Sequence, residues 1–153
     1  MKNTWPVTRT LLMEILADRV SDAFVCELVW ERLGYKKNNE DDRLWTATST
    51  TPSYWSEKFP SSPQFIAHRP ASIHLTRSIP KELKQSLKQY LGFEGYQIKD
   101  LFPRRTRRAT VVNWLVASAI KNGNTIPEEG LLPDLVEPPT NPLQGHSGDI
   151  PIE

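Results

Sequence analysis

The spacing of apolar residues limits the fold most, because it follows a helical period in three segments. Residues 10–19 and 21–34 carry two such patterns separated by a short break, and residues 106–123 carry a third. Gly34 and Gly123 follow the last apolar positions, where helices commonly end. An amphipathic helix must bury its apolar face against another element. These three segments therefore predict helices that share one core.

Shorter patterns fill the middle of the chain. Alternating apolar and polar residues predict strands over 44–48, 71–77 and 96–101, and a helix is expected over 78–92 between the last two strands. The expected fold class is therefore α+β. It is a small single domain with an N-terminal helix pair, then short strands with a β-α-β unit, and a C-terminal helix.

Charge and proline content divide the chain into a domain and a tail. Residues 1–123 are expected to form the single α+β domain, and residues 124–153 a proline-rich acidic tail that is disordered. The net charge of +1 conceals a strong asymmetry. Residues 68–122 contain eleven Lys and Arg but three Asp and Glu, whereas the tail contains six acids and no Lys or Arg.

Four arginines precede the apolar run of the last predicted helix, in the stretch "PRRTRRATVVNWLVAS". The N-terminus of a helix favours negative charge, so arginines in its first turn oppose the helix dipole. Such a conflict is typical of a functional site, and guanidinium groups bind phosphate or carboxylate well. The sequence predicts an anion-binding or partner-binding site at Arg104, Arg105, Arg107 and Arg108. The alternative is internal pairing with Asp100, Glu94 or the acidic tail.

Lys81, Lys84 and Lys88 lie at helical spacing on one face of the segment 78–92. They are either a solvated helix face or an extension of the arginine site. The expected function is a non-enzymatic binding module whose basic face engages a polyanion, with RNA or DNA as the leading partner. The acidic tail could also fold back and mask this face.

Little in the sequence supports catalysis. It contains no glycine-rich phosphate loop, and His68, His74 and His146 have no partner at a motif spacing. We therefore expect no catalytic residue, no metal and no cofactor. Cys26 is the single cysteine, which excludes an internal disulfide, and its apolar neighbours predict burial. Trp45 and Trp55 flank an irregular segment and are possible anchors of a protein interface.

Three stretches resemble a known but uncharacterised family: "SDAFVCELVWERLGY", "FIAHRPASIHLTRSIPKELKQSLKQYLGF" and "PRRTRRATVVNWLVA". The family, catalogued as a domain of unknown function, occurs in cyanobacteria and in plant and algal plastids. The resemblance implies a cytoplasmic protein, or a stromal one in a plastid. It also suggests a second function, that of an assembly factor or adaptor that binds an acidic face of a photosynthesis-related complex. No apolar stretch is long enough to span a bilayer, so we expect no membrane insertion.

Overall fold

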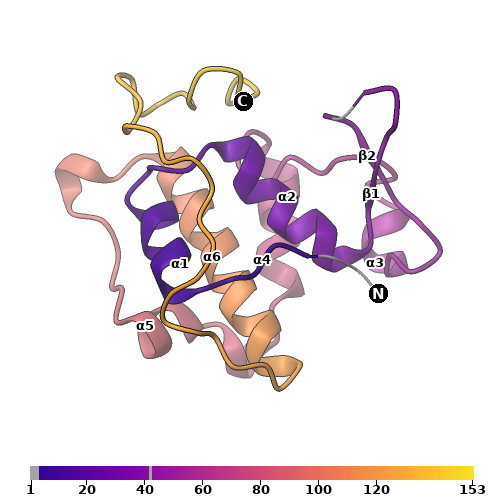
Figure 1. Ribbon diagram of the computed structural model, residues 1–153, viewed down its shortest axis with the longest axis horizontal. Coiled ribbons are helices and arrows are strands. Elements are labelled where there is room, and N and C mark those ends of the chain that lie inside the picture. Colours follow the sequence, from indigo (N-terminus) through magenta and orange to yellow (C-terminus); the bar gives the residue numbers. More distant parts are fainter. Residues whose placement is uncertain (1–3, 42) are drawn as a thin grey trace.

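The computed structural model describes residues 4–41 and 43–153 and shows a small, helix-rich α+β domain (Figure 1). Residues 1–3 and 42 of the expected domain lie outside the described part. The elements follow in the order α1 (Arg9–Leu16), α2 (Asp22–Leu33), β1 (Lys36–Lys37), β2 (Trp45–Thr46), α3 (Ser53–Ser56), α4 (Arg69–Ser78), η1 (Lys81–Leu83), α5 (Ser86–Leu91), η2 (Ile98–Asp100) and α6 (Pro103–Lys121). The strands β1 and β2 pair in an antiparallel register.

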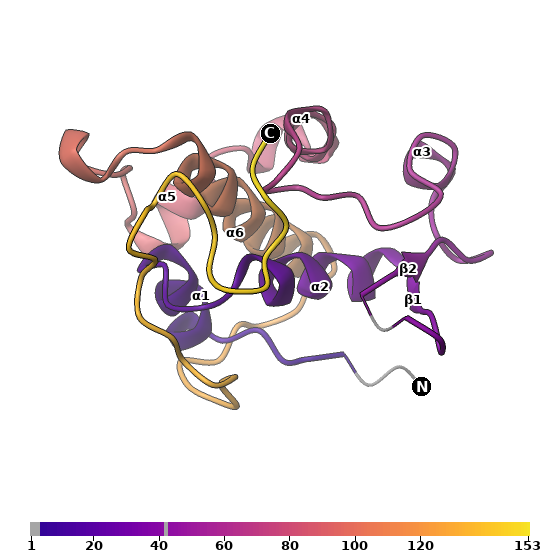
Figure 2. The ribbon, with the colours of Figure 1, turned by 90° about the horizontal axis from the view of Figure 1, so that it is seen from above.

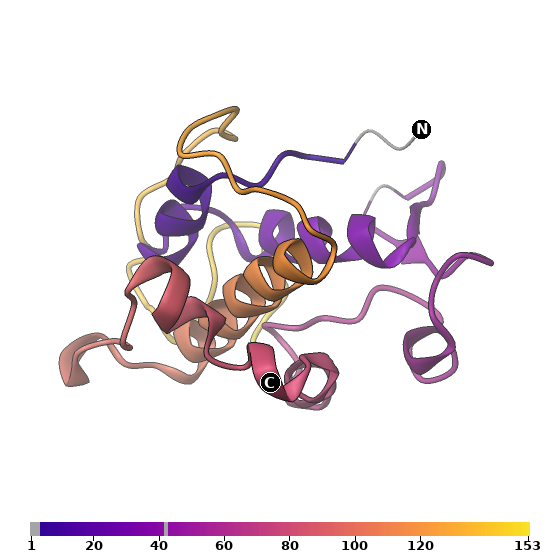
Figure 3. The same ribbon diagram turned by 90° about the horizontal axis from the view of Figure 1, so that it is seen from below.

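Helix α6 forms the centre of the molecule. It contacts α1, α2, α4 and α5, which surround it on several sides (Figure 3). Its core-facing residues recur three and four positions apart, as one face of a helix requires. They are Val111, Val112, Leu115 and Val116, all 2% exposed or less. The longest helix therefore supplies the surface on which the shorter ones pack.

The predicted N-terminal helix pair is confirmed. The Thr8 side chain caps α1 by accepting a hydrogen bond from the Leu11 backbone N–H. Ser21 caps α2 in the same way, and α2 ends at Gly34 in a left-handed conformation with φ of 87°. The residue types at Ser21 and Gly34 therefore predicted where α2 begins and ends.

The predicted β-α-β unit is wrong. Residues 71–77 lie inside α4, and its buried residues Ala71, Ser72 and Leu75 follow a helical rather than an alternating spacing. Pro70 lies in the first turn, where it is compatible with a helix. The second expected strand, 96–101, is a loop that contains the short 3₁₀ turn η2. Of the three predicted strands, which all lie within the described residues, one is found: β2 lies inside the segment 44–48.

The helix expected over 78–92 is shorter than predicted. Its first part is the 3₁₀ turn η1, and only Ser86–Leu91 form the helix α5. Gly92 ends α5 in a left-handed conformation with φ of 70°, at the predicted position. Among residues 4–41 and 43–153, none of the helices has the length and apolar character needed to cross a membrane.

Residues 124–153 contain no regular element within the described chain, yet they lie against the domain along much of their length (Figure 2). The carbonyl of Pro127 accepts a hydrogen bond from the N–H of Arg9, at the start of α1. Further along, the Val136 N–H donates to the Arg19 carbonyl, and the Glu153 N–H donates to the Ala67 carbonyl. The segment expected to be disordered thus runs past α1 to the start of α2 and on toward α4.

Candidate functional site

The four arginines all lie in the first two turns of α6, because this helix begins at Pro103 rather than after Thr106. Arg104 and Arg108 are four residues apart and so lie on the same face of the helix. That face is directed into the protein, and the two residues are only 1% and 0% exposed. Two guanidinium groups are therefore buried beside the core.

Asp18 and Asp22 pair with both buried arginines. Arg104 donates to Asp18 Oδ2 from Nη1 at 2.7 Å and to Asp22 Oδ2 from Nε at 2.9 Å. Arg108 donates from Nη1 to Asp22 Oδ1 at 2.7 Å and from Nη2 to the Ile15 carbonyl at 2.8 Å. Charge-assisted bonds of this kind are the strong ones, especially when Arg binds in a bidentate way. We refer to Asp18, Asp22, Arg104 and Arg108 as the charge cluster.

The corner between α1 and α2 positions the two carboxylates. Asp18 lies just past the end of α1 with φ of 63°, a left-handed conformation that Asp tolerates better than most residues. Burial alone raises the pKa of Asp18. The hydrogen bond from Arg104 and the charge of Arg108 outweigh burial, so the pKa of Asp18 lies below its ordinary value. Asp18 is thus held ionised by the arginines.

Arg105 and Arg107 are also engaged internally. Arg105 donates from Nε to Asp18 Oδ2 at 3.1 Å and from Nη1 to the Asp100 carbonyl at 3.1 Å. Arg107 donates to the Ile66 carbonyl at 2.8 Å, and burial lowers its pKa. Each of the four guanidinium groups thus donates hydrogen bonds to oxygen atoms of the chain itself. Arg104, Arg105 and Arg108 therefore show the internal pairing with acids that the sequence left as the alternative, while Arg107 donates to backbone carbonyls.

The main partners of that pairing, Asp18 and Asp22, were missed by the sequence analysis, which named Asp100, Glu94 and the tail. Of these, Asp100 does lie near an arginine, with its Oδ1 atom 3.6 Å from Arg105 Nη1. The available signal was the stretch "ADRVSD", where two acids flank the break between the first two predicted helices. A carboxylate at a helix-helix corner can reach a third helix that packs against both.

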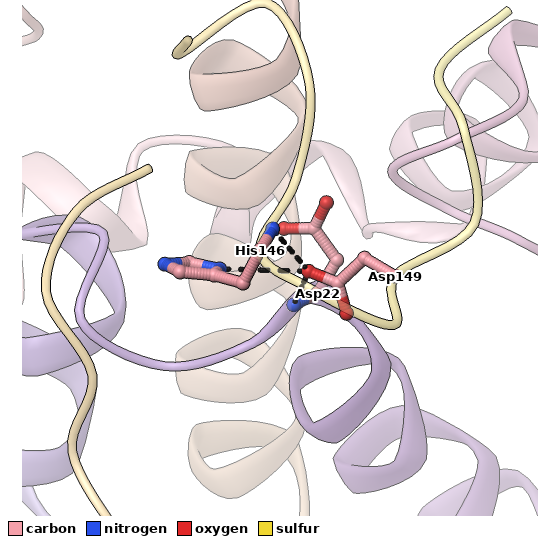
Figure 4. A group of neighbouring side chains, drawn as sticks. All are labelled: Asp22, His146 and Asp149. Carbon is pink, nitrogen blue, oxygen red and sulfur yellow. Dashed lines mark hydrogen bonds and ion pairs between the residues drawn. The ribbon is translucent and has the colours of Figure 1, made fainter. Parts of the chain in front are cut away.

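His146 and Asp149 of the tail join the cluster at its edge (Figure 4). Asp22, His146 and Asp149 each bring a possible metal-ligand atom to within 4.8 Å of the others. However, Asp22 Oδ1 already accepts from both Arg104 and Arg108. Two adjacent guanidinium groups would repel a metal cation. The arrangement thus fits internal charge pairing better than metal binding.

The three lysines of the predicted basic face are exposed. Lys84 donates to the Thr76 carbonyl at 2.7 Å, and Lys88 Nζ lies 3.8 Å from Glu94 Oε1. Lys84 and Lys88 line a groove of about 330 Å³ between α5 and α6, whose lining also includes Leu87, Phe93 and Ala109. We call it the lysine groove. Asn113 of α6 fixes its geometry by accepting from the Leu87 N–H and donating to the Lys84 carbonyl.

The tryptophans considered as interface anchors are core residues. Trp45 and Trp55 are 7% and 2% exposed. Trp45 packs on Trp30 with ring centroids 5.6 Å apart, and Trp55 packs edge-on against Phe65 at 5.4 Å. Cys26 is buried as expected, and desolvation raises the pKa of its thiol to about 12. A thiol with such a pKa is a poor nucleophile.

The fold and the site define a small helix-rich domain that contains a buried charge cluster beside its apolar core, with the lysine groove on its surface. The family model of a domain of unknown function (DUF1823) matches residues 6–119, and the chain belongs to this family. A structure solved by solution NMR is similar, with 44% sequence identity and a TM-score of 0.66. The match covers 78% of this chain and 98% of that one. No curated protein matches the sequence.

Proposed function

We propose that the protein is a non-enzymatic binding module, and that the lysine groove engages an acidic segment of a partner protein. The supporting observation is the groove itself, whose lining combines apolar residues with two lysines and one acid, Glu94, which lies 3.8 Å from Lys88. Leu87, Phe93 and Ala109 can bury apolar side chains, while Lys84 and Lys88 attract carboxylates. An acidic amphipathic segment matches both properties at once.

The wider charge distribution supports the same proposal. Apart from the four internally paired arginines, all remaining cations of the basic segment 68–122 are exposed: Arg69, Arg77, Lys81, Lys84, Lys88, Lys99 and Lys121. They outnumber the three acids of that segment. A positive field of this kind increases the rate at which an acidic partner associates.

Nucleic acid is the second candidate, and the internal pairing of the arginines makes it weaker. Arginine forms bidentate contacts with phosphates, and these side chains are already bonded to Asp18, Asp22 and backbone carbonyls. The exposed cations that remain are mostly lysines, and a sequence-independent contact with phosphates is within their reach. The resemblance to a family of oxygenic phototrophs suggests that the protein partner belongs to a photosynthesis-related complex.

The proposal can be tested by fluorescence anisotropy with two labelled probes, an acidic peptide rich in Glu and Leu and a mixed-sequence single-stranded oligonucleotide. The test variant carries Lys81→Glu and Lys88→Glu, two exposed positions at or beside the groove. Lys84 is left in place because its hydrogen bond to Thr76 contributes to the local structure. We expect peptide binding at low salt and a loss of about tenfold or more in the variant, because two attractive charges become repulsive.

The matched control carries Lys36→Glu and Lys58→Glu, which make the same change in net charge. Both are exposed, and Lys36 lies in β1, at the end of the molecule opposite to α5 (Figures 1 and 2). We expect the control to bind the peptide nearly as well as the unmodified protein. Equal losses of peptide affinity in both variants would show that only the net charge matters, and not the groove. Preferential binding of the oligonucleotide would favour the second candidate.

A further inference from the structure

The last ten described residues form a strap over the start of α2. We call residues 144–153 the C-terminal strap. The carboxylate of Asp149 accepts from the Asp22 N–H at 2.9 Å and from the Ala23 N–H at 3.1 Å. These two N–H groups belong to the first turn of α2, where no helical partner exists for them. The Asp149 side chain is only 2% exposed, so it is a buried anchor of the strap.

Other contacts hold the strap on both sides of this anchor. His146 Nε2 lies 2.9 Å from the Asp18 carbonyl, and the His146 side chain is 7% exposed. The Glu153 N–H donates to the Ala67 carbonyl at 2.8 Å, and Ile152 packs against the core. The strap thus binds through one carboxylate, the apolar side chain of Ile152 and its backbone, as an extended peptide ligand does.

A cavity lies beside the strap, and its lining mixes apolar residues with charged ones, among them Glu27, Asp41 and Arg43. Its volume is about 300 Å³, and its lining includes Ala23, Cys26 and Trp30 of α2 together with Ile66. Gly148 and Ile150 of the strap form part of its wall. The Asp149–Ile150 pair therefore places a carboxylate on the first turn of α2 and an apolar side chain, 45% exposed, at the rim of the adjacent cavity.

The family model matches the surface under the strap but not the strap itself. The start of α2, the cavity residues of α2 and Ile66 all lie within residues 6–119, which the family model matches. The strap lies outside this range. The family domain thus contains the receiving surface, while the segment that covers it is an extension of that domain in this chain.

We propose that this surface is a peptide-binding site, which the strap occupies in cis. The site binds an extended segment of a partner protein in which an aspartate is followed by a bulky apolar residue. Such a segment displaces the strap by presenting the same carboxylate to Asp22 N–H and Ala23 N–H and an apolar side chain to the cavity. This inference does not depend on the lysine groove, which lies between α5 and α6.

The test uses the full chain and a labelled peptide with the sequence of residues 144–153, "QGHSGDIPIE". In the unmodified protein the tethered strap competes at a high effective concentration, so the free peptide should bind weakly. Asp149→Ala removes the anchor of the strap, and we expect this variant to bind the peptide at least about tenfold more tightly. The same peptide with its aspartate replaced by alanine should lose this binding. Glu137→Ala, at an exposed acid of the tail outside the strap, is the matched control and should behave like the unmodified protein.

Hydrogen exchange of the Asp22 and Ala23 amides reports whether the strap has been released. We expect faster exchange in Asp149→Ala and renewed protection when the peptide is added. Unchanged exchange would overturn the proposal, since Asp149 would then not anchor the strap. Faster exchange without peptide binding would overturn it as well. A concentration-dependent dimer in size-exclusion chromatography, formed by exchange of straps, would assign the site to a second copy of this chain and not to a different protein.

Discussion

At the scale of single residues, the charge cluster stands out because it is buried. Two carboxylates and two guanidinium groups have been removed from water, and their mutual attraction must offset the cost of desolvation. Burial opposes the charge of Arg104, but its hydrogen bonds to Asp18 and Asp22 raise its pKa above the ordinary value. The cluster joins residues more than eighty positions apart in sequence. Its members stabilise the fold only as a complete set.

Arg104→Ala should therefore lower the free energy of unfolding by about 3–5 kcal/mol, because it leaves two buried carboxylates with too little positive charge. Urea denaturation followed by circular dichroism measures this change. Arg69→Ala removes an exposed arginine and should change the stability by no more than about 0.5 kcal/mol. A small effect at Arg104, similar to that at Arg69, would show that the cluster contributes little to the fold.

At the scale of elements, the sequence predicted both ends of α2 correctly, but not the starts of α5 and α6 or the identity of the short segments. Ser21 and Gly34 bound α2 as their residue types suggest, because capping depends on local chemistry. Residues 71–77 were misassigned because Ile73 and Leu75 alternate with polar residues over a stretch too short to separate the two periods. Packing determines that this segment is a helix, because α4 contacts α6 and buries Ala71 and Leu75 on one helical face. Tertiary contacts of this kind cannot be seen in a window of seven residues.

Gly34 provides a test of the element boundary between α2 and β1. Its φ of +87° disfavours any other residue, and a Cβ atom would lie 2.6 Å from Thr50 Oγ1 and 3.2 Å from the Thr50 carbonyl carbon. Gly34→Ala should destabilise the protein by about 2–4 kcal/mol, from backbone strain and overpacking together. Gly123 has a similar φ of +69°, but no described atom lies within 4 Å of the position that a Cβ atom would take. Gly123→Ala should therefore lower the free energy of unfolding by only about 1–2 kcal/mol, from backbone strain alone. Thermal denaturation of both variants separates the two effects, and equal losses would exclude the clash with Thr50.

At the scale of the whole molecule, the charge asymmetry of the sequence is resolved by pairing between distant segments. The arginine cluster and its conflict with the helix dipole could be predicted, since both follow from local composition. The partners of the arginines could not be predicted, because the approach of the α1–α2 corner to α6 is a property of the packed helices. The tail was judged from composition alone. Its contacts use single residues such as Asp149 and backbone groups, which composition does not reveal.

The pH dependence of global stability follows from the same pairing. The folded protein holds the pKa of Asp18 below its value of 3.8 in a model peptide. Asp18 therefore contributes stability that is fully present above about pH 4 and is lost as the pH falls through its folded-state pKa. Asp18→Asn should be less stable by about 3 kcal/mol at neutral pH, because it leaves the arginines short of a charged partner. The difference should shrink as the unmodified protein is acidified below about pH 4, because its Asp18 then gains a proton. Urea midpoints measured over this range, with the exposed Asp134→Asn as control, test the argument; a constant difference would mean that Asp18 does not act through its charge.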